Sequence, residues 1–348
     1  MRILKNSLTW LSVVSVVLFF AVNLMAQDLN QQKQEIIRKV HEIDKRLANA
    51  TPDEYEQLKK EREQLAEQLK DVNAKLMADA DAMKKINAVR KAYNDGNNAY
   101  KLGQYKTAVE YYDKATSSDA TFYQAYYGKG LALNKMRKYT AAIEAYKGCV
   151  AQNPAYANAY VEMGKIYNKL GQVDNAIKTY QSAVENNPGS YKAYYQLGAA
   201  YLDKKKNYNM AAQNFTKATQ LNPDYDLAHY SLGVSLTELK RYDEALIALD
   251  KAIGVTKRRK WESPHYRKAV IYNKQGNFAK AKAAADEALK NKKNYAPAAY
   301  EAGKASKDLG RYNQAIAYFK IAQKDRQWKR TADYEIDLIV NRDKYGGN

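Results

Sequence analysis

The chain has 348 residues and a formal charge of +19, with 57 Lys and Arg against 38 Asp and Glu. Its single cysteine, Cys149, excludes an intramolecular disulfide framework and a cysteine-based zinc site, and its three histidines lie too far apart in sequence for metal ligation at helical spacing. Glycine and proline are scarce, with 16 and 6 residues, whereas Ala, Lys, Leu and Glu are common, which favours helix over sheet.

The first 26 residues differ in composition from the rest of the chain. Arg2 and Lys5 form a short positive start, and an uncharged, mostly apolar run occupies 7–26. This order is typical of a secretory signal, so we expect cleavage of 1–26 and a mature start at Gln27. The run is also about 20 residues long, which is enough for a membrane-spanning helix, so an uncleaved inner-membrane anchor is the alternative. Both interpretations place the remainder outside the cytoplasm, in the periplasm of a bacterial-type envelope.

Residues 27–88 have apolar residues at alternating steps of four and three, in two sets separated by "ANATPDEYE". The sets run through Ile36, Val40, Ile43 and Leu47, and then Leu58, Leu65, Leu69, Val72 and Leu76. Lys33 and Arg62 interrupt this heptad seam. Thr51 can cap a helix and Pro52 suits a first helical position, so we expect a second helix to begin at Pro52. The segment is either an antiparallel hairpin, packed on itself or on the chain beyond residue 88, or a coiled coil that makes a homo-oligomer.

Beyond residue 88, one pattern recurs about every 34 residues. An aromatic or aliphatic residue comes after a short turn at Tyr105, Tyr139, Val173, Tyr208, Tyr242, Phe278 and Tyr312. An alanine lies three residues later, at Ala108, Ala142, Ala176, Ala211, Ala245, Ala281 and Ala315. Four residues further on lie Tyr112, Tyr146, Tyr180, Phe215, Leu249, Ala285 and Phe319. Upstream, a small residue recurs at Gly96, Gly130, Gly164, Gly198, Gly233, Ala269 and Gly303.

Two closely packed antiparallel helices explain this pattern. Small residues let the helix axes approach, and aromatic residues fill the gap on the neighbouring helix. One such pair cannot bury its apolar face alone, so neighbouring pairs must stack. The pattern resembles the tetratricopeptide repeat (TPR) family, with seven units over 89–329 and then a capping helix and tail over 330–348. The resemblance implies an all-α, right-handed superhelix of helical hairpins, whose first helices line a concave groove for partner segments.

We find no catalytic constellation in the sequence, which has no glycine-rich phosphate loop, no His-x-x-x-His pair and no Gly-x-Ser-x-Gly. Cys149 occupies a small-residue position of the second unit, so we interpret it as a buried core thiol. We therefore expect no enzymatic activity, no cofactor and no metal site.

A second set of tyrosines lies outside the core positions of the repeat. Its members are Tyr93, Tyr127, Tyr195, Tyr230, Tyr266 and Tyr300, and the third unit has Val161 instead. By the family resemblance this position faces the groove, where tyrosine offers a rigid, amphipathic contact surface for a ligand. The other interpretation is that these rings are half-exposed and pack on neighbouring helices.

Eight residues further along the same helices, the first three units have Lys101, Lys135 and Lys169. Asn134 and Asn168 precede two of these lysines, and Lys165 lies one turn from Lys169. Asn97 fits the family's carboxylate clamp, although Tyr93 stands where that clamp has lysine. These residues predict that the first three repeats bind an acidic or carboxylate-bearing segment.

Together these features predict an exported, non-enzymatic scaffold that binds protein or peptide partners in its groove. The alternatives are a basic adaptor for an anionic envelope polymer or membrane surface, and a non-catalytic subunit of an envelope enzyme complex. The positive charge would also attract nucleic acid, but the secretory segment argues against that partner. Direct membrane contact is expected only if residues 1–26 stay attached.

Overall fold

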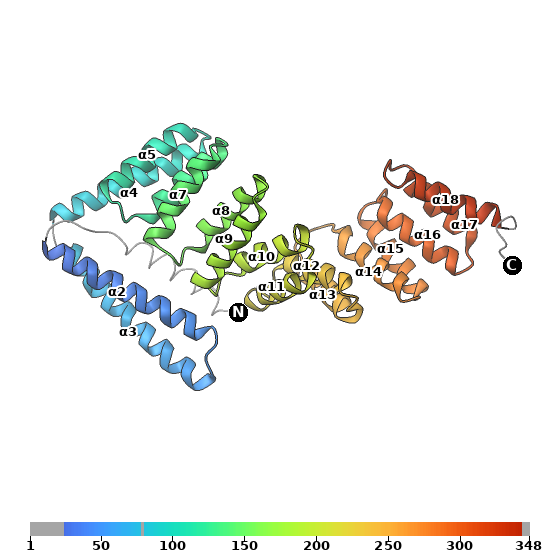
Figure 1. Ribbon diagram of the computed structural model, residues 1–348, viewed down its shortest axis with the longest axis horizontal. Coiled ribbons are helices and arrows are strands. Elements are labelled where there is room, and N and C mark those ends of the chain that lie inside the picture. Colours follow the sequence, from blue (N-terminus) through green and yellow to red (C-terminus); the bar gives the residue numbers. More distant parts are fainter. Residues whose placement is uncertain (1–23, 78–79, 343–348) are drawn as a thin grey trace. The chain divides into compact units, whose positions relative to one another are not determined.

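The structure is a computed structural model that describes residues 24–77 and 80–342. Within these residues the fold is all-α, with helices packed as consecutive hairpins, which confirms the predicted fold class (Figure 1). Residues 1–23, most of the predicted secretory segment, lie outside the described residues. No helix of the described part combines the length and apolar character needed to cross a membrane.

The described residues fall into two compact units that divide after Gln196, inside helix α10 (Tyr191–Asp203). The first unit contains α2 (Leu24–Leu47), α3 (Pro52–Met77), α4 (Ala80–Lys101), α5 (Tyr105–Ser118), α6 (Tyr123–Lys135), α7 (Tyr139–Gln152), α8 (Ala157–Lys169) and α9 (Val173–Asn186). The second unit contains α11 (Tyr208–Leu221), α12 (Asp226–Glu238), α13 (Tyr242–Val255), α14 (Glu262–Lys274), α15 (Phe278–Asn291), α16 (Ala296–Asp308), α17 (Tyr312–Ala322) and α18 (Lys329–Val340).

Helices α2 and α3 lie side by side as an antiparallel hairpin (Figure 1). Helix α3 begins at Pro52 as predicted, and the Glu54 carboxylate accepts hydrogen bonds from the backbone N–H and the hydroxyl of Thr51, at 3.1 and 2.8 Å. The buried side chains Ile36, Ile43, Leu58, Leu65, Leu69 and Val72 belong to one apolar cluster with the core of the first repeat. The alternative, self-association through these residues, stays a prediction.

The polar interruptions of the heptad seam have different environments. Arg62 donates through Nε to Asp44 Oδ1 across the hairpin, at 2.7 Å. Lys33 is only 2% exposed, and nearby Ile37 packs against the core of the second repeat. Burial lowers the pKa of the Lys33 ammonium to about 7, although Asp119 raises it in part. The position of α2 therefore places a costly charged group in the protein interior.

The recurring glycine and aromatic residue of each repeat are in direct contact. A Cβ atom at Gly164 would lie 2.3 Å from the Tyr180 ring, and one at Gly130 would lie 2.4 Å from the Tyr146 ring. Both rings are fully buried. Since the helix axes can approach this closely only without a side chain, glycine is required wherever an aromatic ring occupies the core.

The turn between the two helices of a repeat needs one residue with a left-handed backbone conformation. Glycine supplies it at Gly103, Gly171, Gly276 and Gly310, with φ between 71° and 75°. Arg137, Lys206 and Lys240 adopt the same conformation, with φ of 59°, 53° and 60°. A side chain in this region costs roughly 1–2 kcal/mol, so three of the repeats contain local strain.

We expect Lys240→Gly to raise the free energy of unfolding by about 1 kcal/mol, because glycine removes the strain at φ 60°. Urea unfolding measures the change. The matched control is Gln275→Gly, since Gln275 occupies the preceding turn position of another repeat at φ −86°. The control is expected to lose stability, and a loss in both variants would contradict the strain argument.

Candidate partner-binding surface

The first helices of neighbouring repeats form one layer in each unit. Helix α4 contacts α6 in the first unit, while α12 contacts α14 and α14 contacts α16 in the second. Hollows open instead between second helices, from α11 to α13 and from α15 to α17. Because the first helices pack closer together than the second helices, each layer of first helices is the inner face of its stack.

The predicted tyrosine row lies on these first helices, where each ring is half-buried. In the first unit, the Tyr93 ring lies 5.0 Å from Phe122 in an edge-on contact, and 6.0 Å from Tyr112. Tyr127 repeats this arrangement with Tyr156, at 5.0 Å, and with Tyr146. The rings therefore join consecutive repeats while part of their surface stays exposed, so packing and ligand contact are compatible roles.

The second unit contains the same arrangement. The Tyr230 ring lies 5.3 Å from Trp261, and Tyr266 lies 5.7 Å from Tyr295. Tyr300 lies 5.0 Å from Trp328 and donates its hydroxyl to Glu335, at 3.2 Å. Tyr195 is half-buried on α10, and Val161, which stands in its place in the third repeat, is buried.

The partners of these tyrosines are aromatic residues that the sequence analysis missed. They directly precede a first helix or the final helix α18, at Phe122, Tyr156, Trp261, Tyr295 and Trp328, and Tyr225 has the same position before α12. Their recurrence about once per repeat was the signal that could have identified them. In the third repeat the tyrosine and this partner are both replaced, by Val161 and Ser190.

The predicted asparagines are turned towards the repeat cores. Asn97 Oδ1 accepts the hydroxyl of Tyr112 at 2.8 Å, and Asn168 Nδ2 donates to the Tyr180 hydroxyl at 3.3 Å. The Oδ1 atoms of Asn134 and Asn168 are buried without a hydrogen-bond partner among the residues that the structure describes. The amides of Asn97 and Asn168 bond to tyrosine hydroxyls in the core, so a direct role of Asn97 towards a carboxylate stays a prediction.

Two of the predicted lysines lie together. Lys135 and Lys169 line a hollow of about 540 Å³ with Asn134, Arg137 and Tyr139, which we call the basic hollow. The Lys169 ammonium lies 5.5 Å from the centre of the Tyr139 ring. The cations of the basic hollow lie at the ends of the first helices of the second and third repeats, and in the turn that follows α6.

The other two predicted lysines lie apart from the basic hollow. Lys165 pairs with Glu162 at 2.7 Å, so its charge is compensated on its own helix. Lys101 is exposed at the end of α4 and is not among the residues that line the hollow. The structure therefore brings together Lys135 and Lys169, and adds Arg137, which was not among the predicted site residues.

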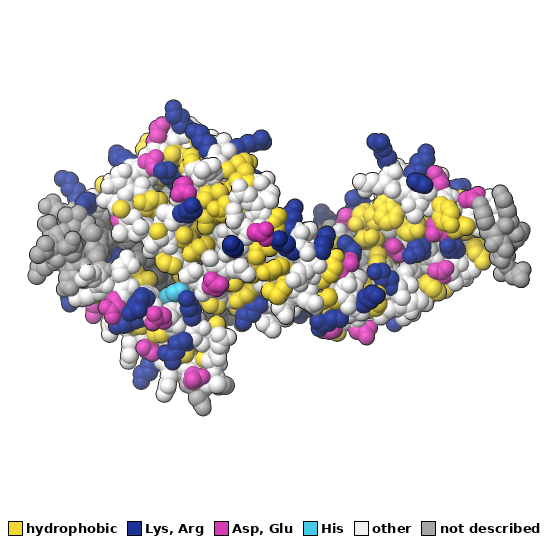
Figure 2. All heavy atoms as spheres, in the orientation of Figure 1, with side chains coloured by type: hydrophobic (Ala, Val, Ile, Leu, Met, Phe, Trp, Pro, Cys, Tyr) yellow, Lys and Arg dark blue, Asp and Glu magenta, His cyan; other side chains and the backbone are white. Residues whose placement is uncertain are grey.

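The densest basic stretch of the sequence, "TKRRKWESP", has both structural and exposed members. Arg258 lies 4.7 Å from the centre of the Trp261 ring and donates through Nε to Asp226, at 3.1 Å. Lys257, Arg259 and Lys260 are exposed. Figure 2 shows Lys and Arg spread over the drawn face of both units with Asp and Glu among them, so positive charge is not confined to this loop.

The described part of the chain contains no cluster of His, Cys, Asp and Glu suited to a metal ion. Cys149 is fully buried in the second repeat, and burial raises the pKa of its thiol. A buried thiol of this kind is inert. The chemistry that these surfaces offer is recognition of another molecule through aromatic, cationic and apolar contacts.

Comparison with protein families agrees with this architecture. Family models of the tetratricopeptide repeat match residues 93–157, 133–201 and 266–330. The chain is a tetratricopeptide repeat protein. A further family model, of the anaphase-promoting complex (cyclosome) subunit 3, matches residues 169–252 of this TPR protein. None of the curated proteins compared with it matches in sequence.

Solved structures show the same fold at low sequence identity. Pseudomonas aeruginosa pilF is 14% identical with a TM-score of 0.51, over 62% of this chain and 96% of its own. A TPR protein of Parabacteroides merdae is 19% identical with a TM-score of 0.47, over 73% and 100%. YrrB, described as a TPR protein with an unusual peptide-binding site, is 21% identical with a TM-score of 0.48, over 55% and 99%.

Proposed function

We propose that this TPR protein is a non-enzymatic scaffold that binds an acidic segment of a partner protein on the first-helix face of its first unit. The observation that supports this most directly is the basic hollow, where Lys135, Arg137 and Lys169 converge. None of these three side chains forms an ion pair with any residue that the structure describes. An acidic ligand would supply the missing counter-charge, and half-buried Tyr127 of α6 with Tyr93 of the neighbouring α4 would contact its apolar side chains.

The proposal includes export to the periplasm, which is supported by the positive start and apolar run of residues 1–26. Mass spectrometry of the protein purified from its native cells tests this part. A mature mass beginning at Gln27 supports cleavage, and an intact Met1 in an envelope fraction supports the anchored alternative. Recovery of the intact chain from the cytosol would overturn export.

A basic adaptor for an anionic polymer is the second candidate, and the exposed residues Lys257, Arg259 and Lys260 support it. Binding to a polyanion releases counterions, so its affinity falls steeply with salt concentration. An acidic segment held by the three cations of the basic hollow and by aromatic contacts loses less affinity, because it neutralises fewer charges than a polyanion does. Titrating partner binding between low and moderate salt therefore separates the two candidates.

Replacing Lys135, Arg137 and Lys169 of the basic hollow together by glutamine is expected to weaken binding of an acidic partner. Each exposed cation contributes about 0.2–1 kcal/mol. Replacing Tyr93 and Tyr127 by alanine should cost more, roughly 1–2 kcal/mol each where the ligand buries the ring. Calorimetry with the partner recovered from an envelope extract, and with a synthetic glutamate-rich peptide as probe, measures both losses.

The matched control for this experiment replaces three exposed lysines of second helices by glutamine, at Lys106, Lys114 and Lys178. It changes the net charge equally but leaves the first-helix face intact. Circular dichroism must show that every variant keeps its helix content, because the tyrosines also pack between repeats. If the control loses as much affinity as the basic-hollow variant, the net positive charge rather than the basic hollow recognises the ligand.

A further inference from the structure

Helix α13 of the second unit has one large apolar side chain, Ile247, among the charged residues of its exposed face. Its sequence, "YDEALIALDKAIGV", interrupts the apolar residues with only four charged side chains. Ile247 is 70% exposed on its outer surface. The equivalent position on the second helices of the first four repeats is polar, with Glu110, Glu144, Lys178 and Gln213. Ile247 therefore makes the exposed face of α13 more apolar than the equivalent faces of the first four repeats.

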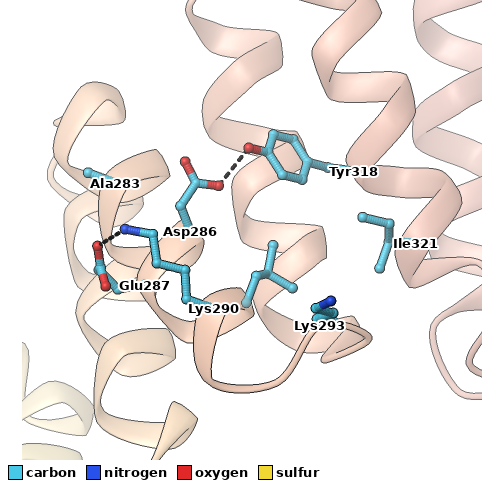
Figure 3. Close-up of a pocket in the computed structure, with 8 residues that line it drawn as sticks. Ala283, Asp286, Glu287, Lys290, Lys293, Tyr318 and Ile321 are labelled. Carbon is cyan, nitrogen blue, oxygen red and sulfur yellow. Dashed lines mark hydrogen bonds and ion pairs between the residues drawn. The ribbon is translucent and has the colours of Figure 1, made fainter.

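A hollow of about 1,100 Å³ lies beside this face, between α11 and α13. Leu232 and Leu236 of α12 line it between the two helices, and Ala212 and Ala248 line it from α11 and α13. The hollow between α15 and α17 is smaller, about 640 Å³, and there Tyr318 reaches across to Asp286 at 2.6 Å (Figure 3). In the α11–α13 hollow, the residue equivalent to Tyr318 is Ala248, so no side chain of that size crosses it.

The charges on the α13 face are arranged symmetrically about Ile247 and Ala248. Glu244 precedes Ile247 by three residues, and Lys251 comes three residues after Ala248. All four line the same hollow, at the i, i+3, i+4 and i+7 positions of one helical face. When a second α13 lies antiparallel with its two-fold axis between positions 247 and 248, each Glu244 faces the Lys251 of the other copy.

We propose that this face is an isologous interface between two copies of the protein. Ile247 of each copy inserts into the α11–α13 hollow of the other, and two Glu244–Lys251 pairs fix the antiparallel register. Glu244 now pairs with Arg241 of its own chain, at 2.6 Å. Both side chains are more than half exposed, so this ion pair is weak and Glu244 can pair with Lys251 of the other copy instead. The hollow and the exposed isoleucine offer the apolar contact, and the self-complementary charges favour a second copy over an unrelated ligand.

The charge pairs provide the sharpest test. Sedimentation equilibrium over a range of concentrations measures dimerisation of the wild-type protein, which we expect to be reversible because two short helices make a small interface. Lys251→Glu places like charges opposite each other and should raise the dissociation constant at least about tenfold, and Glu244→Lys should do the same. The double variant Glu244→Lys/Lys251→Glu restores opposite charges and should regain dimerisation. A double variant as weak as the single variants would overturn the proposed register.

Residues 27–88 are a separate candidate for self-association, so the contact itself must be located. A short bis-maleimide should cross-link the Ile247→Cys variant through its partner copy, whereas the wild type, whose Cys149 is buried, should not react. Leu102→Cys is the matched control, because Leu102 is 74% exposed in the first unit and lies outside the proposed interface. A monomeric wild type, or equal cross-linking of the two cysteine variants, would overturn the proposal.

Discussion

Replacing Gly164 by alanine is expected to destabilise the protein by about 1–3 kcal/mol, although alanine is the better helix former. The added Cβ would lie 2.3 Å from Cε1 of the Tyr180 ring, which has no free space because it is fully buried. Removing the ring with Tyr180→Ala should cost more, about 3–5 kcal/mol, because it leaves a cavity between the two helices.

The double variant Gly164→Ala/Tyr180→Ala should lose less stability than the sum of the two single variants. The alanine at 164 no longer clashes once the ring is gone, and it fills part of the cavity. The sixth repeat has this combination naturally, with Ala269 and Ala285 both fully buried. Urea unfolding of the four proteins gives the coupling energy, which we expect at about 1–3 kcal/mol.

Gly189→Ala is the control for this cycle. A Cβ at Gly189 would meet only Asn187 Oδ1, at 3.5 Å, so its effect should stay within about 0.5 kcal/mol. If the effects at 164 and 180 add without coupling, the close approach of the two helices is not what requires glycine.

Lys33→Met is expected to stabilise the protein near neutral pH by about 3 kcal/mol, with a limit of roughly 5 kcal/mol from the full difference in pKa. Burial holds the pKa of Lys33 at about 7, against 10.5 for an ordinary lysine. Between these values the unfolded chain binds the proton and the folded protein does not, so the free energy of unfolding rises with pH. Below about pH 7 both states are protonated, and the penalty of the buried ammonium is fully present.

The advantage of the Lys33→Met variant should therefore be largest near pH 6 and shrink by about half near pH 9. Urea unfolding at the two pH values, with hydrogen exchange of α2, measures this. Lys39→Met is the control, because Lys39 lies on the same helix and is exposed. An advantage of the same size at both pH values would show that α2 does not bury a charged Lys33.

Much of the fold was predictable because the same residue pattern occurs seven times in the sequence. Seven copies of a small residue, a core residue and a turn gave the helical hairpins, and Thr51 with Pro52 gave the start of α3. Each of these patterns involves residues close together in the sequence, so the helices and turns can be predicted without knowing what each helix packs against. The left-handed conformation of Arg137 and Lys240, by contrast, is known only from the structure.

The candidate site was harder to predict because its features depend on pairs of residues from different repeats. The half-exposure of Tyr93 results from Phe122 of the next repeat, and the basic hollow needs Lys135 and Lys169 from consecutive repeats. Asn97 looked available for a ligand until the structure showed its bond to Tyr112. The burial of Lys33 could likewise not be predicted from the sequence, because it depends on how α2 lies against other elements.

The contact between the small residue and the core residue also restricts how duplicated repeats can diverge. A Cβ at Gly233 would lie 2.7 Å from Leu249, so even leucine still requires glycine opposite it. Only the sixth repeat, with Ala285, has alanine in place of the glycine. A lineage that moves from tyrosine to alanine must therefore shorten the core residue first and replace the glycine last, because the reverse order passes through a clash. The repeats of this one chain show the stages of that path, from Gly164 with Tyr180, through Gly233 with Leu249, to Ala269 with Ala285.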